Sequence, residues 1–216
     1  MSANHAAFNL IFRFVENYVS PIAGRISSQR HVMAIRDGFI SAMPFMIVGS
    51  FLLVFAYPPF SPDTTWGFAR AWLDMAKQFE GQILTPFDMT MGVMSLYICA
   101  AIAYNLGKHY VKTHQLDPFM CAMLSLMAFL LVAAPKTKGA LPVDSLGGTG
   151  IFTAILVAIY CVEMMRFLKA HNIGIRLPDQ VPPMIKNSFD LLIPVLVVVL
   201  TLYPLSLLIQ SQFGML

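Results

Sequence analysis

The sequence predicts an all-α, polytopic integral membrane protein with about five transmembrane helices and an N-terminal interfacial amphipathic helix. Of its 216 residues, 57% are hydrophobic and only 12% are charged, whereas about a quarter of a soluble globular chain is charged. The mean hydropathy is +0.69. A soluble chain of this length buries only roughly 70% of its surface on folding, so the remaining apolar surface needs lipid as a second solvent.

The segment before the first span predicts a helix that lies on the membrane surface. Over residues 4–20, apolar side chains cover one helical face, and a helix of this kind lies in the headgroup plane. Packing on the protein itself is an equally good interpretation. Pro21 is expected to end this helix. The mixed charges of residues 1–37 do not resemble a cleavable signal peptide. The polar face carries Asn9, Arg13, Glu16, Asn17 and Ser20.

The remainder divides into five uncharged or nearly uncharged stretches, each near the roughly 20 residues that a spanning helix needs. They are residues 38–57, 89–106, 118–134, 150–168 and 191–209. We therefore assign residues 1–37 to a cytoplasmic interfacial segment and residues 38–216 to a five-span membrane domain. Pro44, Pro194 and Pro204 fall inside spans, where proline kinks a helix.

The connections between spans also carry signals. The segment 58–88 begins with a proline-rich stretch and continues as an expected short helix over residues 64–80, where Trp66 and Trp72 suit the interfacial belt. The connection 135–150 holds two prolines and four glycines and is expected to be rich in turns.

Positive charge predicts the orientation. With a cytoplasmic N-terminus, ten of the 14 Lys and Arg residues lie in inside segments and four in outside segments. The positive-inside rule then favours an N-terminus inside and a C-terminus outside. The net charge is only +3 and the cations are scattered, so nucleic acid is excluded as a partner and membrane lipid is expected instead.

No catalytic pattern is present, because the sequence has no GxSxG, P-loop or HExxH motif. Cys99, Cys121 and Cys161 lie in apolar runs without metal-ligand spacing and are interpreted as packing residues. We assign no catalytic, substrate-binding or metal-ligating residue and no cofactor, and we expect the chain not to be an enzyme.

Three charged positions near the spans have two interpretations each. Glu163 lies three residues before Arg166, which favours an ion pair over a carboxylate on a substrate path. Arg36 and Asp37 stand at the entry to the first span, where we expect their side chains to extend to the lipid headgroups. The alternative is a role beyond the membrane interface. Asp88 is expected to stabilise the N-terminus of the second span through the helix dipole rather than to bind substrate.

Small residues recur every four positions along the second span, and such a row lets another backbone approach closely. The partner helix belongs either to the same chain or to a second copy. The row consists of Ser95, Cys99, Ala103 and Gly107.

Three stretches resemble the membrane IIC (permease) component of the lactose/cellobiose/diacetylchitobiose family of bacterial phosphotransferase systems. They are Pro21-Ile-Ala-Gly-Arg25 with His31-Val-Met-Ala-Ile-Arg-Asp-Gly-Phe39 and Ala42-Met-Pro-Phe45; Thr90-Met-Gly-Val-Met-Ser-Leu96; and Leu177-Pro-Asp-Gln-Val-Pro-Pro183 with Asn187-Ser-Phe189 and Leu192-Ile-Pro194. Their order and spacing also fit. The resemblance covers almost the whole chain, and the third stretch is the most specific.

The resemblance implies ten spans in a full-length protein, of which this chain matches the N-terminal five. That half forms the homodimer interface and a fixed scaffold, while the other half supplies the sugar-binding His and Glu, so no sugar-binding residue transfers to this chain. In the intact system, in the bacterial cytoplasmic (inner) membrane, IIC carries a β-linked disaccharide such as cellobiose or diacetylchitobiose inward. A separate IIB partner, phosphorylated through IIA, HPr and enzyme I, then phosphorylates the sugar.

Two other functions remain open on the residues alone. One is a non-transporting membrane assembly or interaction protein that keeps the fold. The other is a small five-span transporter of another family.

Overall fold

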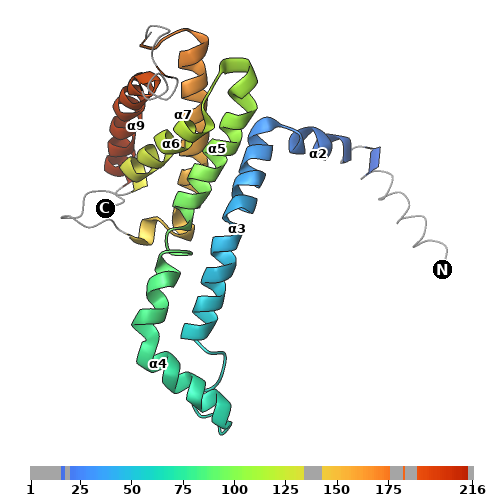
Figure 1. The fold of residues 1–216 in the computed structure, drawn as a ribbon, viewed down its shortest axis with the longest axis vertical. Coiled ribbons are helices and arrows are strands. Elements are labelled where there is room, and N and C mark those ends of the chain that lie inside the picture. The colour runs from blue at the N-terminus through green and yellow to red at the C-terminus, as the bar shows by residue number, and fades with distance from the viewer. Residues whose placement is uncertain (1–15, 18–19, 134–142, 176–181, 183–188, 214–216) are drawn as a thin grey trace, which may run out of the picture.

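The computed structural model describes residues 16–17, 20–133, 143–175, 182 and 189–213. The described elements are helical, as predicted (Figure 1). In chain order they are α2 (Ser20–Ser27), α3 (Arg30–Ala56), α4 (Gly67–Asp88), α5 (Met94–His114), α6 (Pro118–Ala133), the 3₁₀ turns η2 (Val143–Ser145) and η3 (Gly148–Gly150), α7 (Ile151–Ala170) and α9 (Leu192–Phe213).

Helix α5 lies at the centre of a bundle and packs against α3, α6 and α7, while α9 packs against α6 and α7 (Figure 1). The core joins Ile98 and Ile102 of α5 to Phe129 of α6 and Val162 of α7, all fully buried. Close packing of such side chains supplies dispersion contacts in the bundle interior.

The three cysteines belong to this same interior. Cys99, Cys121 and Cys161 are free and buried, and the Sγ of Cys99 lies 3.5 Å from the carbonyl oxygen of Ser125. Their prediction as packing residues is confirmed.

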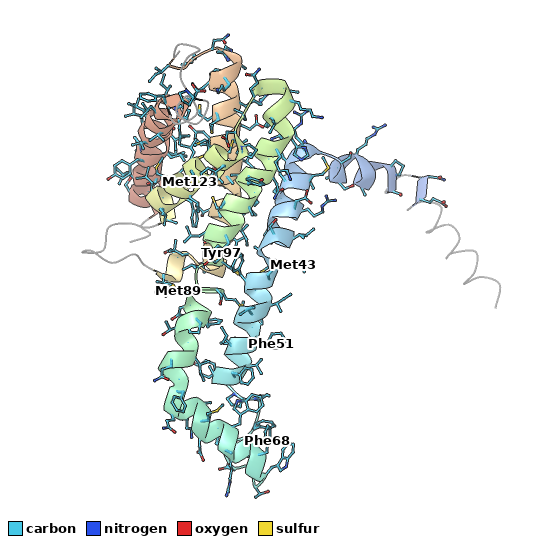
Figure 2. The ribbon with its side chains drawn as sticks, viewed as in Figure 1. Met43, Phe51, Phe68, Met89, Tyr97 and Met123 are labelled. Atoms are coloured by element: carbon cyan, nitrogen blue, oxygen red, sulfur yellow. The ribbon has the colours of Figure 1, made fainter. Side chains whose placement is uncertain are left out.

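The second half of α3 and helix α4 form a two-helix arm that extends away from the bundle (Figure 1). Helix α4 is longer than the helix expected over residues 64–80, and it is broken at Phe79, where φ is −113° and ψ is 15°. Phe68 lies at the far end of the arm (Figure 2). There Trp72 contacts Phe55, Phe60 and Phe68 at ring-centroid distances of 5.6, 5.6 and 6.0 Å, so an aromatic cluster closes the tip.

The five expected spans correspond in order to α3, α5, α6, α7 and α9. Three described segments are long and apolar enough to cross a membrane, namely Arg30–Ala56, Gly148–Ala170 and Leu192–Ile209, while the apolar Pro118–Ala133 is shorter. The second expected span is displaced, because residues 89–93 form turns and α5 continues to His114.

The expected surface helix over residues 4–20 lies almost wholly outside the described residues. Its expected end beside Pro21 also adjoins residues outside the described part of the chain, and Pro21 itself is the second residue of α2. Proline is well tolerated in the first turn, where its missing N–H has no intrahelical acceptor. Helix α2 leaves the start of α3 at a steep angle and extends away from the bundle (Figure 1).

The small-residue row of α5 is used inside the chain. Ser95, Cys99 and Ala103 are fully buried, and a Cβ on Gly107 would lie 3.1 Å from Cys121 Sγ and from the Cα of Pro118. Of the two interpretations that the sequence left open, the structure therefore selects packing between α5 and α6.

A second small-residue row, on α3, was missed. Ala34, Gly38, Ala42, Gly49 and Ala56 are the buried residues of this helix, at intervals of four or seven positions. A Cβ on Gly38 would lie 2.4 Å from Cγ1 of Ile102, so α3 approaches α5 closely at this point. The signal was the spacing of these glycines and alanines, the same pattern that identified the row of α5.

Candidate functional site

A carboxylate joins three helices at the end of the bundle from which α2 extends. Glu163 of α7 accepts hydrogen bonds at Oε1 from the Tyr110 hydroxyl of α5, at 2.5 Å, and from Nε2 of His31 of α3, at 3.0 Å. Its Oε2 accepts from Nε of Arg166 at 2.6 Å. The side chain of Glu163 is only 25% exposed, so these partners replace water around its charge. We call Arg30, His31, Tyr110, Glu163 and Arg166 the Tyr110 cluster.

Two arginines flank the aromatic ring of this cluster. The guanidinium carbons of Arg30 and Arg166 lie 5.3 and 5.4 Å from the centroid of the Tyr110 ring, within the range of cation–π attraction. Two guanidinium groups and one carboxylate therefore meet at one tyrosine, and the cluster carries an excess of positive charge.

The predicted ion pair between Glu163 and Arg166 is confirmed. The sequence reasoning missed His31, which is 132 positions from Glu163 in the chain. The pairing depends on the packing of α3 and α7 around α5, which no local spacing in the sequence indicates. The only local signal was that His31 falls within the first resemblance stretch.

Arg36 and Asp37 pair with each other, with Arg36 Nη2 2.8 Å from Asp37 Oδ1. The Arg36 side chain is 61% exposed, so the pair lies on the surface of α3 and leaves little net charge there.

Asp88 does not begin a helix. It is the last residue of α4, and α5 begins six residues later at Met94. The expectation of a carboxylate at the N-terminus of the second span is therefore wrong. The helix dipole at a C-terminus disfavours a carboxylate, so Asp88 gains nothing from the stabilisation that we expected.

The break between α4 and α5 lies beside the apolar part of α3. A Cβ on Gly49 would meet Cγ of Met91 at 2.5 Å, and Figure 2 shows Met89 beside the part of α3 between Met43 and Phe51. The second resemblance stretch, residues 90–96, thus forms this break and the first turn of α5. A Cβ on Gly92 would lie 2.5 Å from the Asp88 carbonyl oxygen, which explains a glycine there. Interrupted helices at membrane depth are typical of transporters.

The end of α3 is tied to α4 across the arm. The Tyr57 hydroxyl donates to Oε1 of Glu80 at 3.0 Å. This hydrogen bond joins α3 to α4 together with the Trp72 Nε1–H, which donates to the Phe55 carbonyl oxygen at 3.2 Å.

Two hollows lie on the described surface. A groove of about 310 Å³ between α3, α5 and α6 is lined by Ser41, Phe45, Tyr97, Ala100, Ala101, Tyr104, Asn105 and Ala122. The rings of Phe45 and Tyr97 stack there at 4.4 Å. A smaller cavity of about 150 Å³ between α7 and α9 contains the Lys169–Asp190 ion pair. Among the described residues, no group of three or more His, Cys, Asp or Glu could hold a metal ion.

The fold and its motifs can now be compared with known proteins. Residues 36–216 match the family described as "Phosphotransferase system, EIIC". The chain belongs to this family. This match contradicts the alternative of a small five-span transporter of another family. It confirms the family resemblance of the three motif stretches.

Relatives of the EIIC chain fall in the cellobiose and lactose group. The chain is 37% identical over 206 residues to the cellobiose-specific EIIC component of Geobacillus stearothermophilus, covering 87% of this chain and 43% of that protein. It is 33% identical over 220 residues to the lichenan permease IIC component of Bacillus subtilis (strain 168), covering 94% and 46%. It is 32% identical over 199 residues to the lactose-specific EIICB component of Lactococcus lactis subsp. lactis, covering 90% and 34%.

The fold matches a solved EIIC structure. The crystal structure of the transporter ChbC, the IIC component of the N,N'-diacetylchitobiose-specific phosphotransferase system, superimposes with a TM-score of 0.76 at 34% identity, over 92% of this chain and 47% of that one. The chain is therefore a multi-pass membrane protein of a transporter family, and the all-α membrane fold is confirmed. The chain spans about half the length of the cellobiose and lichenan relatives.

The resemblance stretches have structural roles where the structure describes them. His31 joins the Tyr110 cluster and Gly38 contacts Ile102, both in the first stretch. The Ser95 hydroxyl of the second stretch donates to the Leu146 carbonyl oxygen. The third stretch, at residues 177–194, lies largely outside the described residues.

Proposed function

We propose that this chain is the scaffold half of the permease (IIC) subunit of a phosphoenolpyruvate-dependent phosphotransferase system for β-linked disaccharides such as cellobiose or diacetylchitobiose. The observation that carries the proposal is the extent of the match. The match covers nine-tenths of this chain but only 47% of ChbC. This chain therefore corresponds to one continuous half of a transporter.

The sugar class is inferred from what the relatives' names have in common. They name cellobiose, lichenan, lactose, oligo-β-mannoside and diacetylchitobiose. All five contain sugar units joined by β-linkages, whereas the sugar units themselves differ. Because the β-linkage is shared while the sugar units vary, we infer that the β-linkage is the common property of these substrates. We propose a β-linked disaccharide for this system on that basis.

In the intact system, the sugar would be carried inward by IIC and phosphorylated by a IIB partner that receives phosphate from IIA. The name EIICB for the lactose relatives joins IIC and IIB in one protein, which supports a IIB partner acting beside this membrane domain. The cysteines of this chain are buried in the bundle, so they are poorly placed to act as the exposed phosphate donor.

The scaffold role is supported by the tight packing of the bundle. Helix α5 has eight buried residues, and small residues on both α3 and α5 bring three helices into close contact. A rigid half of this kind suits an element against which another half moves. The distribution of Lys and Arg residues supports an orientation in which the α2 end of the bundle faces the cytoplasm. The N-terminus then lies on the cytoplasmic side of the bacterial cytoplasmic membrane.

A homodimer is part of the proposal, and its contact must lie outside the row of α5. Helix α3 offers another surface, where Ile40, Met43, Ile47, Phe51 and Val54 are all exposed. Their intervals of three and four residues form one apolar stripe, as on helices that pair along a seam. We place the dimer contact on this stripe of α3.

Uptake of radiolabelled cellobiose and diacetylchitobiose tests the proposal directly. Cells would express this chain alone, the complementary half of the Geobacillus stearothermophilus relative alone, or both together. We expect uptake only with both halves and only when IIB and IIA are present. Robust uptake by this chain alone would contradict the scaffold assignment, and no uptake in any combination would contradict a role in transport.

The second candidate is a non-transporting membrane assembly protein that keeps the fold. Gene context separates the two functions. A neighbouring reading frame for five more spans, with genes for IIB and IIA, favours the permease, whereas an isolated gene favours the assembly protein.

A further inference from the structure

We propose that the elbow between α2 and α3 binds the phosphate headgroup of an anionic phospholipid, with Arg30 as its main ligand and Arg25 as a second. The proposal is independent of any sugar, because it rests on the charges at one end of the bundle and on the direction of α2.

The first observation is an imbalance of charge at the α2 end of the bundle. Four described carboxylates there have partners: Asp37 pairs with Arg36, Glu163 with Arg166, and Asp190 with Lys169, while Asp117 accepts from the backbone N–H groups of Phe119 and Met120. Glu16, four residues before α2, is exposed and contributes one negative charge. Within the described part of the chain, none of these ion pairs uses Arg25, Arg30, Lys108 or Lys112. This face therefore presents a surplus of positive charge.

The second observation is that Arg30 is held in place by an aromatic ring. Its guanidinium lies 5.3 Å from the centroid of Tyr110, and Tyr110 is itself fixed by its hydrogen bond to Glu163. Arg30 also interacts with the Tyr110 hydroxyl. A guanidinium has five N–H donors in a planar fork, so further donors of Arg30 can bind phosphate oxygens. Arg166, on the same ring, is paired with Glu163, so the charge of Arg30 is the one left over in the cluster.

The third observation is depth. His31 precedes Gly38, the start of the uncharged stretch of α3, by seven residues, or roughly 10 Å along the helix. The headgroup region adds about 5–8 Å on each side of the hydrocarbon core, so the Tyr110 cluster lies just beyond it, at a distance that a long arginine side chain can span. Helix α2 turns sideways at this level (Figure 1), which brings Arg25 along the membrane surface and exposes Ile26 for insertion between lipids.

A basic cluster at this depth faces the lipid phosphates from the aqueous side. Phosphatidylglycerol carries a net negative charge and phosphatidylcholine does not, so the two lipids separate headgroup charge from phosphate alone. Free inorganic phosphate carries the same chemistry without the acyl chains and provides a third probe.

The test is lipid binding to the purified chain in neutral detergent, counted by native mass spectrometry. We expect phosphatidylglycerol to bind more tightly than phosphatidylcholine, and Arg30→Gln to lower its affinity about fivefold, the effect of one cation at a membrane surface. The matched control is Arg70→Gln, because Arg70 lies on the arm and donates to the Thr64 carbonyl oxygen; it should leave the affinity unchanged. Should Arg30→Gln fail to fold, Arg25→Gln on the exposed α2 should lower the affinity in the same direction.

Three results would overturn the proposal. Equal binding of the two lipids would remove the preference for anionic headgroups. An equal loss with Arg70→Gln would show that net charge alone acts. Displacement of phosphatidylglycerol by millimolar inorganic phosphate would identify a site for free anions instead of lipid.

Discussion

His31 Nε2 lies 3.0 Å from Glu163 Oε1, although 132 positions separate the two residues in the chain. The contact connects the start of α3 to the end of α7, and Tyr110 of α5 donates to the same carboxylate oxygen. One side chain thus joins the three helices that form the centre of the bundle. Its removal should loosen all three at the same end.

We therefore expect Glu163→Gln to destabilise the protein by about 2 kcal/mol, the typical contribution of a hydrogen bond to a charged group. The measurement is the thermal unfolding midpoint in detergent. Asp37→Asn is the matched control, because Asp37 belongs to an exposed pair with Arg36, and exposed pairs contribute roughly 0–1 kcal/mol. Equal losses in the two variants would show that the Tyr110 cluster does not hold the helices together.

Packing of α3 on α5 gives a second stability prediction. Gly38→Ala places a Cβ 2.4 Å from Cγ1 and 2.9 Å from the backbone nitrogen of Ile102, so the two helices must separate. We expect a loss of about 1–3 kcal/mol, the usual cost of overpacking. Gly81→Ala in α4 has nothing within 4 Å of the new Cβ, and its midpoint should stay or rise. A neutral Gly38→Ala would mean that α3 is not closely packed there.

The sequence predicted the spanning helices well because an uncharged apolar stretch is a local signal. The expected span over residues 118–134 agrees with α6, and that over 150–168 agrees with α7 to within two residues. The position of Asp88 at the end of α4 was not predicted, because no proline marks the break that follows it. Gly92 lies close to the Asp88 carbonyl oxygen, and this contact is visible only in the folded chain. The contact of His31 with Glu163 was beyond reach for the same reason, since it depends on helix packing and not on spacing.

Oligomeric state tests the surface proposed for assembly. We expect the chain to elute as a homodimer in mild detergent. Ile47→Trp should shift it toward monomer, because Ile47 is exposed in the middle of the stripe on α3 and added bulk prevents close helix contact. Leu156→Trp, at an exposed position of α7, should leave the dimer intact. Elution of the unmodified chain as a monomer would refute the homodimer, and equal effects of both variants would refute the contact on α3.

Topology can be measured with little background, because the three native cysteines are buried. We expect a cysteine at Lys112 to be protected from membrane-impermeant maleimide added to intact cells, and a cysteine at Ser61 to be labelled. Both positions are exposed in the structure, so protection reports the membrane side and not burial. Labelling of the first and protection of the second would reverse the orientation inferred from the cations.

Sugar binding by the chain alone is the remaining prediction, and we expect none that saturates. A disaccharide leaves water only where many hydrogen-bond partners replace its hydration. The described polar groups do not form such a site, because the carboxylate of Glu163 is engaged by three side chains. In the groove beside Tyr97, the polar groups of Ser41, Tyr97 and Asn105 already donate to backbone carbonyl oxygens. Calorimetric titration of the detergent-solubilised chain with cellobiose, diacetylchitobiose and lactose checks this expectation. Stoichiometric micromolar binding of any of the three would place a complete sugar site in this half, and the scaffold assignment would have to be abandoned.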